Sequence, residues 1–191
     1  RPEGIADELH DEAVSRGLIR YCPVCDGYEV TDRRVAVIGT GDHGTAEAQF
    51  LRTYTKDLTL VSPGGDHDLS EQCSAMLETA EIARIAGPCG GFAIENGKFA
   101  FDTADGRMAF DSIYPALGSV VRSGLAVKCG AKVSEGDCIL VGDHLETSVP
   151  GLFAAGDVVL GLDQISHAMG QAGVAATTIR NYLSERMPLR R

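Results

Sequence analysis

The chain has 191 residues, of which 44% are hydrophobic and 23% are charged, and this composition indicates a soluble globular protein with room for one ample domain or two small ones. It excludes disordered, collagen-like and coiled-coil proteins. With 17 Lys and Arg against 27 Asp and Glu, the formal net charge of -10 leaves no basic surface for a nucleic acid or an anionic membrane. Small molecules or other proteins are therefore the expected partners.

The sequence shows no targeting or membrane-spanning segment. No apolar run approaches the roughly 18 residues that a spanning helix needs, and the first four residues, RPEG, lack the pattern of a signal peptide. We therefore expect a cytoplasmic protein. The chain begins with Arg1 rather than Met, so the natural N-terminus is expected upstream of it.

The first part of the chain alternates between helical and strand patterns. Residues 4–16 place apolar side chains at helical spacing between acidic ones, and Gly17 follows as an expected C-terminal cap. Residues 34–38 (RVAVI) form an apolar run without alternation, which is typical of a parallel strand buried on both faces. A helix over 45–54 and a strand over 58–61 complete a predicted βαβ unit.

The middle of the chain predicts another helix and strand and then a small antiparallel meander. The helix is expected over 69–80 and the short strand over 82–86. Between residues 92 and 114, Asn96-Gly97 and Asp105-Gly106 are strong hairpin signals flanked by nearly alternating apolar residues.

The last part of the chain has a weaker pattern. A strand over 113–117 ends at Gly118, and no clear element follows until about Pro150. A strand is expected over 152–155 and a long final helix over 166–183. We find no internal repeat and no low-complexity linker.

Six cysteines occur in the chain, and only Cys22 and Cys25, in the segment CPVCDG, are closely spaced. This spacing favours a disulfide that exchanges readily, and the neighbouring Asp26 can supply or accept the proton that thiol chemistry needs. Half of a zinc site and a pair of inert thiols are the alternatives, but no second CxxC or close Cys/His pair appears, and we expect no metal. The remaining thiols are expected in the core: Cys73, Cys89, Cys129 and Cys138.

A glycine-rich turn lies between the predicted strand 34–38 and the helix after it. Gly39, Gly41 and Gly44 form a GxGxxG pattern, which allows a tight turn and the approach of a dinucleotide pyrophosphate to a helix N-terminus. The alternative is a turn without a ligand. The strand 58–61 is followed by Ser62, which offers a weak hydrogen bond in place of the Asp or Glu that binds NAD or the Arg that binds NADP. The choice between NADH and NADPH stays open.

A third motif lies near the C-terminus. The segment GLFAAGDV ends a predicted strand at Gly156 and Asp157, and a Gln-containing segment then leads into the final helix. Such a turn aims the carboxylate at a sugar hydroxyl and the helix N–H groups at a phosphate or ring carbonyl.

Taken in this order, CPVCDG, VIGTGDHGTAEA and SVPGLFAAGDV, the chain resembles the low-molecular-weight, FAD-dependent thioredoxin reductase family over nearly its whole length. The resemblance implies that Cys22 and Cys25 are the redox-active pair and that Asp26 is the acid/base carboxylate. It implies a nucleotide turn and a flavin site, with these matching residues: Gly39, Gly41, Gly44, Gly156, Asp157, Gln164, Ile165 and Ala168. Which cysteine faces the flavin is left unassigned.

The resemblance also implies a fold and a reaction. The fold is α/β: a Rossmann-like three-layer NAD(P)-binding domain over 1–118, carrying the CxxC and the meander, and a C-terminal segment of a second, FAD-binding domain over 119–191. Electrons are expected to pass from NADPH or NADH through FAD to the disulfide, and from there to a thioredoxin-like protein or a small disulfide. A homodimer is the expected assembly.

Three features depart from the family. The first flavin segment, with its own GxGxxG, is not in the chain. Ser62-Pro63-Gly64 stands where the family has a basic signature for the NADP phosphate, and 118–122 replaces its Gly-x-x-Pro-Asn. These departures keep two alternatives open: a dithiol oxidase that uses O2, and a flavin-free redox-sensing or binding module.

Overall fold

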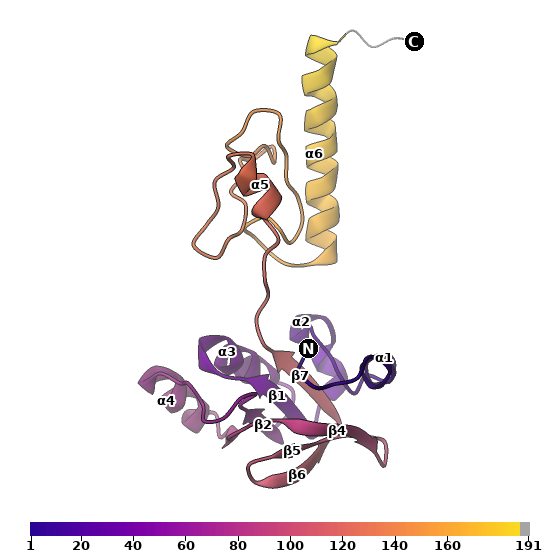
Figure 1. Cartoon of the computed structure of the whole chain (residues 1–191), viewed down its shortest axis with the longest axis vertical. Coiled ribbons are helices and arrows are strands. Elements are labelled where there is room, and N and C mark those ends of the chain that lie inside the picture. The colour runs from indigo at the N-terminus through magenta and orange to yellow at the C-terminus, as the bar shows by residue number, and fades with distance from the viewer. Residues whose placement is uncertain (188–191) are drawn as a thin grey trace. The chain divides into compact units, whose positions relative to one another are not determined.

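The computed structural model describes residues 1–187. The chain divides into two compact units, Arg1–Gly118 and Ser119–Arg191. The first unit contains all the strands that Figure 1 labels, and the second contains helices α5 and α6.

The first unit is built on a four-stranded parallel sheet with the order β3-β2-β1-β7. β1 (Val35–Gly39) pairs in parallel with β2 (Leu58–Val61) on one side and with β7 (Ser112–Ala116) on the other, and β3 (Ala83–Ile85) pairs with β2. β1, β2 and β7 are buried throughout, as expected for strands covered on both faces. This confirms the predicted α/β class with a parallel sheet.

Two layers cover the sheet, because alternate residues of its strands point to opposite faces. On one face, Val35, Val37 and Leu60 pack in one apolar cluster with α3 (Gly41–Leu51) and α4 (Glu71–Thr79). On the other face, Ala36 and Ile38 pack with the phenylalanines of the meander and with α1 (Asp7–Ser15).

The predicted antiparallel meander is confirmed as a separate three-stranded sheet with the order β4-β5-β6. Its strands are β4 (Gly90–Glu95), β5 (Lys98–Thr103) and β6 (Gly106–Phe110). Asn96 and Gly97 both have positive φ angles, 49° and 79°, as a tight hairpin turn requires. The core-facing rings of Phe99, Phe101 and Phe110 are fully buried.

Two short helices between α1 and β1 were not predicted. α2 (Pro23–Asp26) contains the CxxC segment and the 3-10 helix η1 (Gly27–Val30) continues it. The chain reaches α2 from Gly17, whose φ of 67° ends α1 as predicted, and Ile19 then pairs with Ile113 of β7. Four-residue helices carry too few residues for a periodic pattern, so α2 could not be predicted from periodicity.

The second unit contains α5 (Gly124–Lys128), the long helix α6 (Ile165–Arg186) and isolated β-bridges. The strand expected over 152–155 is wrong, because in this segment only Phe153 forms a bridge, with Glu146. Glycines with positive φ flank the segment, and such backbone does not continue a strand. The final helix is confirmed, starting one residue earlier than predicted.

The isolated thiols differ in burial. Cys73 is buried as predicted, and burial raises the pKa of the half-buried Cys89 thiol to about 11, so that it stays protonated. The prediction is wrong for Cys129, which is exposed because it ends the five-residue α5 at the surface. Within residues 1–187, no helix combines the length and the apolar character that a membrane crossing requires.

Candidate functional site

The CxxC segment forms a disulfide at the start of α2. Cys22 and Cys25 are joined, with their Cα atoms 5.2 Å apart. Cys22 is the N-cap residue and Pro23 follows at the first helical position, where its missing N–H costs nothing. The amides of Cys25 and Asp26 both donate to the Cys22 carbonyl, at 2.9 and 3.2 Å. This one turn of helix therefore holds the two cysteines side by side.

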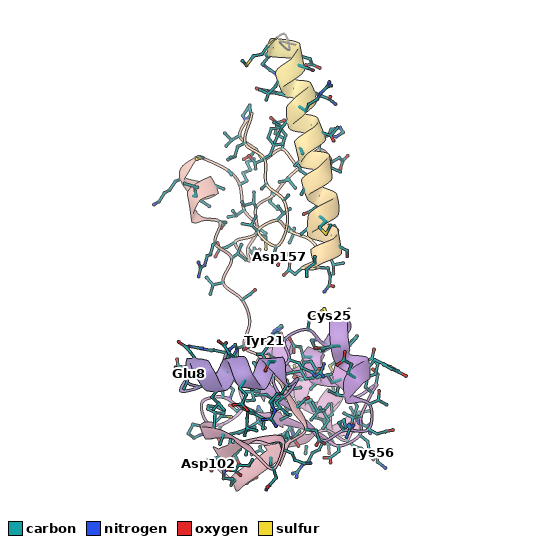
Figure 2. All side chains as sticks on the ribbon, turned by 90° about the vertical axis from the view of Figure 1, so that its right-hand side faces the viewer. Glu8, Tyr21, Cys25, Lys56, Asp102 and Asp157 are labelled. Atoms are coloured by element: carbon teal, nitrogen blue, oxygen red, sulfur yellow. A yellow bond between two sulfur atoms is a disulfide. The ribbon has the colours of Figure 1, made fainter. Side chains whose placement is uncertain are left out.

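The disulfide lies at the surface of the first unit. Cys25 is exposed and Cys22 is half-buried, and Figure 2 shows Cys25 at the end of this unit opposite Asp102 of the meander. Val24 is 68% exposed and Tyr28 is 80% exposed. The disulfide is thus accessible and flanked by exposed apolar and aromatic side chains.

Asp26, the last residue of α2, is held by two interactions. The Tyr114 hydroxyl on β7 donates to Asp26 Oδ1 at 2.8 Å, and an Arg20 guanidinium nitrogen lies 3.2 Å from Asp26 Oδ2. Tyr114 is fully buried. Burial, followed by the hydrogen bond to Asp26, raises the pKa of Tyr114, so its hydroxyl keeps its proton. Each carboxylate oxygen of Asp26 thus has one partner and keeps a further lone pair that can take up a proton.

Arg20 joins the chain segments on both sides of the disulfide. Its guanidinium contacts Asp26 and also Glu29 Oε2, at 2.8 Å, while its Nε donates to the Gly17 carbonyl at 3.0 Å. Burial opposes the charged form of Arg20, but the hydrogen bond to Glu29 and the charge of Asp26 outweigh it and raise the pKa of the guanidinium. Sequence reasoning missed Arg20, Glu29 and Tyr114.

The glycine turn connects β1 to α3. A Cβ on Gly39 would lie 2.7 Å from the Ala116 carbonyl oxygen, and a Cβ on Gly44 would lie 2.9 Å from the Gly39 carbonyl carbon. Gly39 is therefore required by the close approach of β7 to β1, and Gly44 by the packing of α3 on β1. Gly41 has a φ of 62°, and a Cβ there would lie 3.6 Å from the Asp68 carbonyl oxygen, at an ordinary van der Waals distance.

A hydroxyl group of the turn and a carboxyl group of α3 also form polar contacts. The Asp68 amide donates to Thr40 Oγ1 at 2.8 Å, which attaches the loop after β2 to the turn. Four residues apart on α3, His43 Nε2 lies 3.3 Å from Glu47 Oε1. Burial raises the pKa of Glu47 to about 7. Sequence reasoning missed Glu47, although the spacing of His43 and Glu47 on the predicted helix was a usable signal.

The loop after β2 is folded onto the segment after β3. Ser62 is 2% exposed, and its hydroxyl donates to the Asp66 carbonyl at 3.3 Å. The Gly87 amide donates to the Gly65 carbonyl at 2.7 Å. The residues from 62 to 70 include no Lys or Arg. Burial, chiefly, lowers the pKa of His67, so this side chain is neutral at pH 7 and adds no positive charge.

The Gly-Asp motif of the second unit lies beside the first turns of α6. Gly156 has a φ of 80°, and a Cβ there would lie 3.5 Å from the Ala168 Cβ. The Gly156 amide donates to Gln171 Oε1 at 2.7 Å, which fixes this loop on α6. Asp157 is exposed (Figure 2). Sequence reasoning missed Gln171, which its spacing of one turn from Ala168 and two turns from Gln164 could have indicated.

The remaining residues predicted for the flavin site lie at the start of α6. Gln164 is the N-cap of α6, and Ile165, the first residue of the helix, is 83% exposed. The structure thus brings Gly156, Asp157, Gln164 and Ala168 together in the second unit.

Comparison with known proteins defines the class of the chain. Residues 7–172 match the family model described as pyridine nucleotide-disulphide oxidoreductase. The chain belongs to this family.

Among proteins of the family, the chain is similar to thioredoxin reductases. It is 29% identical to the thioredoxin reductase of Listeria monocytogenes serovar 1/2a, over 97% of this chain and 60% of the relative. It is 29% identical to that of Aquifex aeolicus, over 91% of this chain and 56% of the relative. The resemblance stated from the sequence is therefore confirmed, and the chain spans less than two thirds of the length of these relatives.

Solved structures of other proteins are similar in fold to this chain. The structure of HlmI matches with a TM-score of 0.77 and 25% identity, covering 88% of this chain and 53% of HlmI. The thioredoxin reductase of Streptococcus pyogenes MGAS5005 matches with a TM-score of 0.74 and 25% identity, covering 90% of this chain and 58% of that one.

Proposed function

We propose that the chain is part of a thioredoxin reductase-like flavoprotein, in which electrons from a reduced nicotinamide pass through FAD to the Cys22–Cys25 disulfide. The observation that carries this proposal is the surface disulfide on α2, in a chain of this family that also holds the glycine turn. We assign residues 1–118 to the NAD(P)-binding domain and 119–191 to a segment of the FAD-binding domain.

The proposed chemistry is a two-electron exchange. FAD, when held by Asp157 and the start of α6, would supply an electron pair, and reduction of the Cys22–Cys25 bond with this pair and two protons would give two thiols. One thiolate then attacks a disulfide of the partner, forms a mixed disulfide and releases a partner thiolate, and the second cysteine closes the original disulfide again. Asp26, next to Cys25 and within the same turn of helix, is the proposed proton donor and acceptor.

Two features of the second unit support a flavin site there. Gly156 uses a conformation that favours glycine, and the exposed carboxylate of Asp157 is available to accept hydrogen bonds from ribityl hydroxyls. Gln164, Ile165 and Ala168, at the start of α6, are the residues that we propose lie against the isoalloxazine ring. In this proposal the adenosine part of the FAD is held by a segment of the protein outside these residues.

The glycine turn fits a nicotinamide dinucleotide, since Gly41 leaves room for a pyrophosphate at the start of α3. The loop after β2 supplies no cation for the extra phosphate of NADPH, so we propose NADH as the preferred donor. The same loop favours a second candidate function, a dithiol oxidase that passes electrons to O2 and does not respond to nicotinamide.

A thioredoxin-like protein or a small disulfide is the proposed substrate, and the exposed Val24 and Tyr28 offer it an apolar contact beside the disulfide. We also propose a homodimeric, cytoplasmic enzyme. The four cysteines that form no disulfide are consistent with a reducing compartment.

The test is disulfide exchange by the chain itself. The chain, reduced and freed of reductant, is mixed with oxidised thioredoxin or with a small aromatic disulfide, and released thiols are followed. We expect Cys22→Ser and Cys25→Ser each to stop at the mixed disulfide and to leave reduction of the partner incomplete, because either change removes the second thiol that closes the Cys22–Cys25 bond. Cys129→Ser, which removes an exposed thiol of the second unit, is the control and should react like the wild type. Complete reduction of the partner disulfide by both active-site variants would contradict the proposal.

A further inference from the structure

We propose that Arg20 is a positioning residue of the redox turn: together with Tyr114 it fixes Asp26 and Glu29 beside the disulfide and sets how readily the reduced cysteines form thiolates. We call Arg20, Asp26, Glu29 and Tyr114 the arginine cluster. This inference rests on the proposed redox role of Cys22 and Cys25.

The first argument is geometric. Arg20 precedes the disulfide by two residues, and its guanidinium contacts Asp26 and Glu29, which follow the disulfide. Its Nε donates to the Gly17 carbonyl, and its backbone amide donates to the Ile113 carbonyl of β7 at 2.9 Å. The side chain is only 16% exposed. One side chain therefore closes the turn that carries the disulfide and attaches this turn to the edge of the central sheet.

The second argument concerns Asp26. Its two carboxylate oxygens have different partners, the Tyr114 hydroxyl and the Arg20 guanidinium. Tyr114 comes from a strand 88 residues away in the sequence. The end of α2 is thus tied to the core at one oxygen and to the cation at the other. A small rotation of α2 would break at least one of these contacts.

The third argument is electrostatic. Asp26 and Glu29 bring two carboxylates to the redox turn, and a nearby negative charge disfavours a thiolate. Arg20 is the cation that the structure pairs with both of them. Because a guanidinium stays charged at all relevant pH values, this compensation is constant. Loss of Arg20 leaves both carboxylates of the redox turn without this cation, so thiolate formation should require a higher pH.

Other titratable groups surround the turn, and they must be the same residues in the wild type and in every variant that is compared. α3 contacts α2 and carries a His/Glu pair, and tyrosines lie on both sides of the disulfide and near Gly27. These groups are His43, Glu47, Tyr21, Tyr28 and Tyr54. None of them changes in the variants below, so their titration contributes equally to every profile.

The experiment measures thiol reactivity against pH in the 191-residue chain. The reduced chain is alkylated with iodoacetamide from pH 5 to pH 10, and modification is read by mass spectrometry on the tryptic peptide that contains Cys22 and Cys25. In the wild type this peptide runs from Tyr21 to Arg33 and contains no other cysteine. We expect Arg20→Gln to move the midpoint of the profile to higher pH and to slow alkylation at pH 7 by about three- to tenfold. Arg20→Lys keeps the charge without the fork of donors and should recover part of the rate.

The matched control is Glu29→Gln, which removes a carboxylate from the same cluster and leaves the Arg20–Asp26 pair in place. We expect it to move the midpoint to lower pH. A merely structural cluster would be loosened by both changes, so both profiles would move in the same direction or stay unchanged, and either result overturns the proposal. If Arg20→Gln does not fold, the comparison of Arg20→Lys with Glu29→Gln makes the same distinction.

The two proposals fail separately. Opposite shifts in Arg20→Gln and Glu29→Gln, in a chain that reduces neither thioredoxin nor a small disulfide, would support the arginine cluster and overturn the proposed function. Normal disulfide exchange with unshifted pH profiles would support the proposed function and overturn the role of the arginine cluster.

Discussion

At the scale of single residues, burial and pairing decide which groups are ready for chemistry. The Cys89 thiol is shifted by burial to a pKa of about 11 and is unreactive at neutral pH, whereas the Cys22–Cys25 pair lies at the surface. Asp26, which the sequence singled out, turns out to be bound to two partners. The position of Asp26 directly after Cys25 is visible in the sequence. Its contact with Tyr114 could not be predicted, because no local pattern connects residues 88 positions apart.

Glu47 leads to a prediction about stability and pH. Burial raises its pKa to about 7 in the folded chain, above the ordinary value of 4.5 that applies when the chain is unfolded. Folding therefore favours the protonated form, and the stability present below pH 4.5 is lost progressively as the pH rises towards 7. After a discount for partial solvent exposure, we expect a loss of about 1–2 kcal/mol from this group.

The measurement is urea unfolding of the wild type and Glu47→Gln at pH 5, 6, 7 and 8. The amide variant cannot lose a proton, so its free energy of unfolding should fall less over this range. Glu12→Gln, at an exposed carboxylate of α1, serves as the control and should follow the wild type. Parallel pH profiles for the wild type and Glu47→Gln would refute the assignment.

At the scale of elements, the sequence predicted most of the first unit because its patterns are local. The strand over 58–61 was placed correctly, since an apolar β-branched run is sufficient to identify it. The helix after the glycine turn begins at Gly41 and not at residue 45, because the Gly44 amide already donates to the Thr40 carbonyl at 3.1 Å, as in a helix. α2 was missed, as its helical turn depends on a disulfide and on long-range contacts.

The glycine turn shows how one sequence pattern serves two purposes. Gly41 leaves space for a ligand, but Gly39 and Gly44 are glycines because β1, β7 and α3 meet there. We expect Gly39→Ala to destabilise the chain by about 1–3 kcal/mol, whether or not a nucleotide is bound, because its Cβ would meet the backbone and Cβ of Ala116.

Thermal or urea unfolding without nucleotide checks this expectation. Gly64→Ala is the matched control, since Gly64 lies in the loop after β2 and no atom lies within 4 Å of a Cβ there. Its unfolding midpoint should stay close to that of the wild type. If Gly39→Ala were equally harmless, the close approach of β1 and β7 at this position would be disproved.

At the scale of the whole molecule, charge bears on the choice of electron donor. The formal net charge of -10 repels anions in general, and the loop after β2 adds Asp66 and Asp68 without any Lys or Arg. NADPH carries one phosphate more than NADH, and nothing in this loop compensates that phosphate. We therefore expect the chain to bind NADH at least about tenfold more tightly than NADPH, an advantage of about 1.4 kcal/mol.

Nicotinamide fluorescence, titrated with each dinucleotide at low and at high salt, measures this ratio directly. Added salt should reduce the preference, because screening weakens the repulsion of the extra phosphate more than any contact shared by the two dinucleotides. Asp66→Lys places a cation on the same loop and should recover NADPH affinity several-fold while leaving NADH binding nearly unchanged. Tighter binding of NADPH by the wild type would show that the phosphate is held by residues other than this loop, and the preference for NADH would then have to be abandoned.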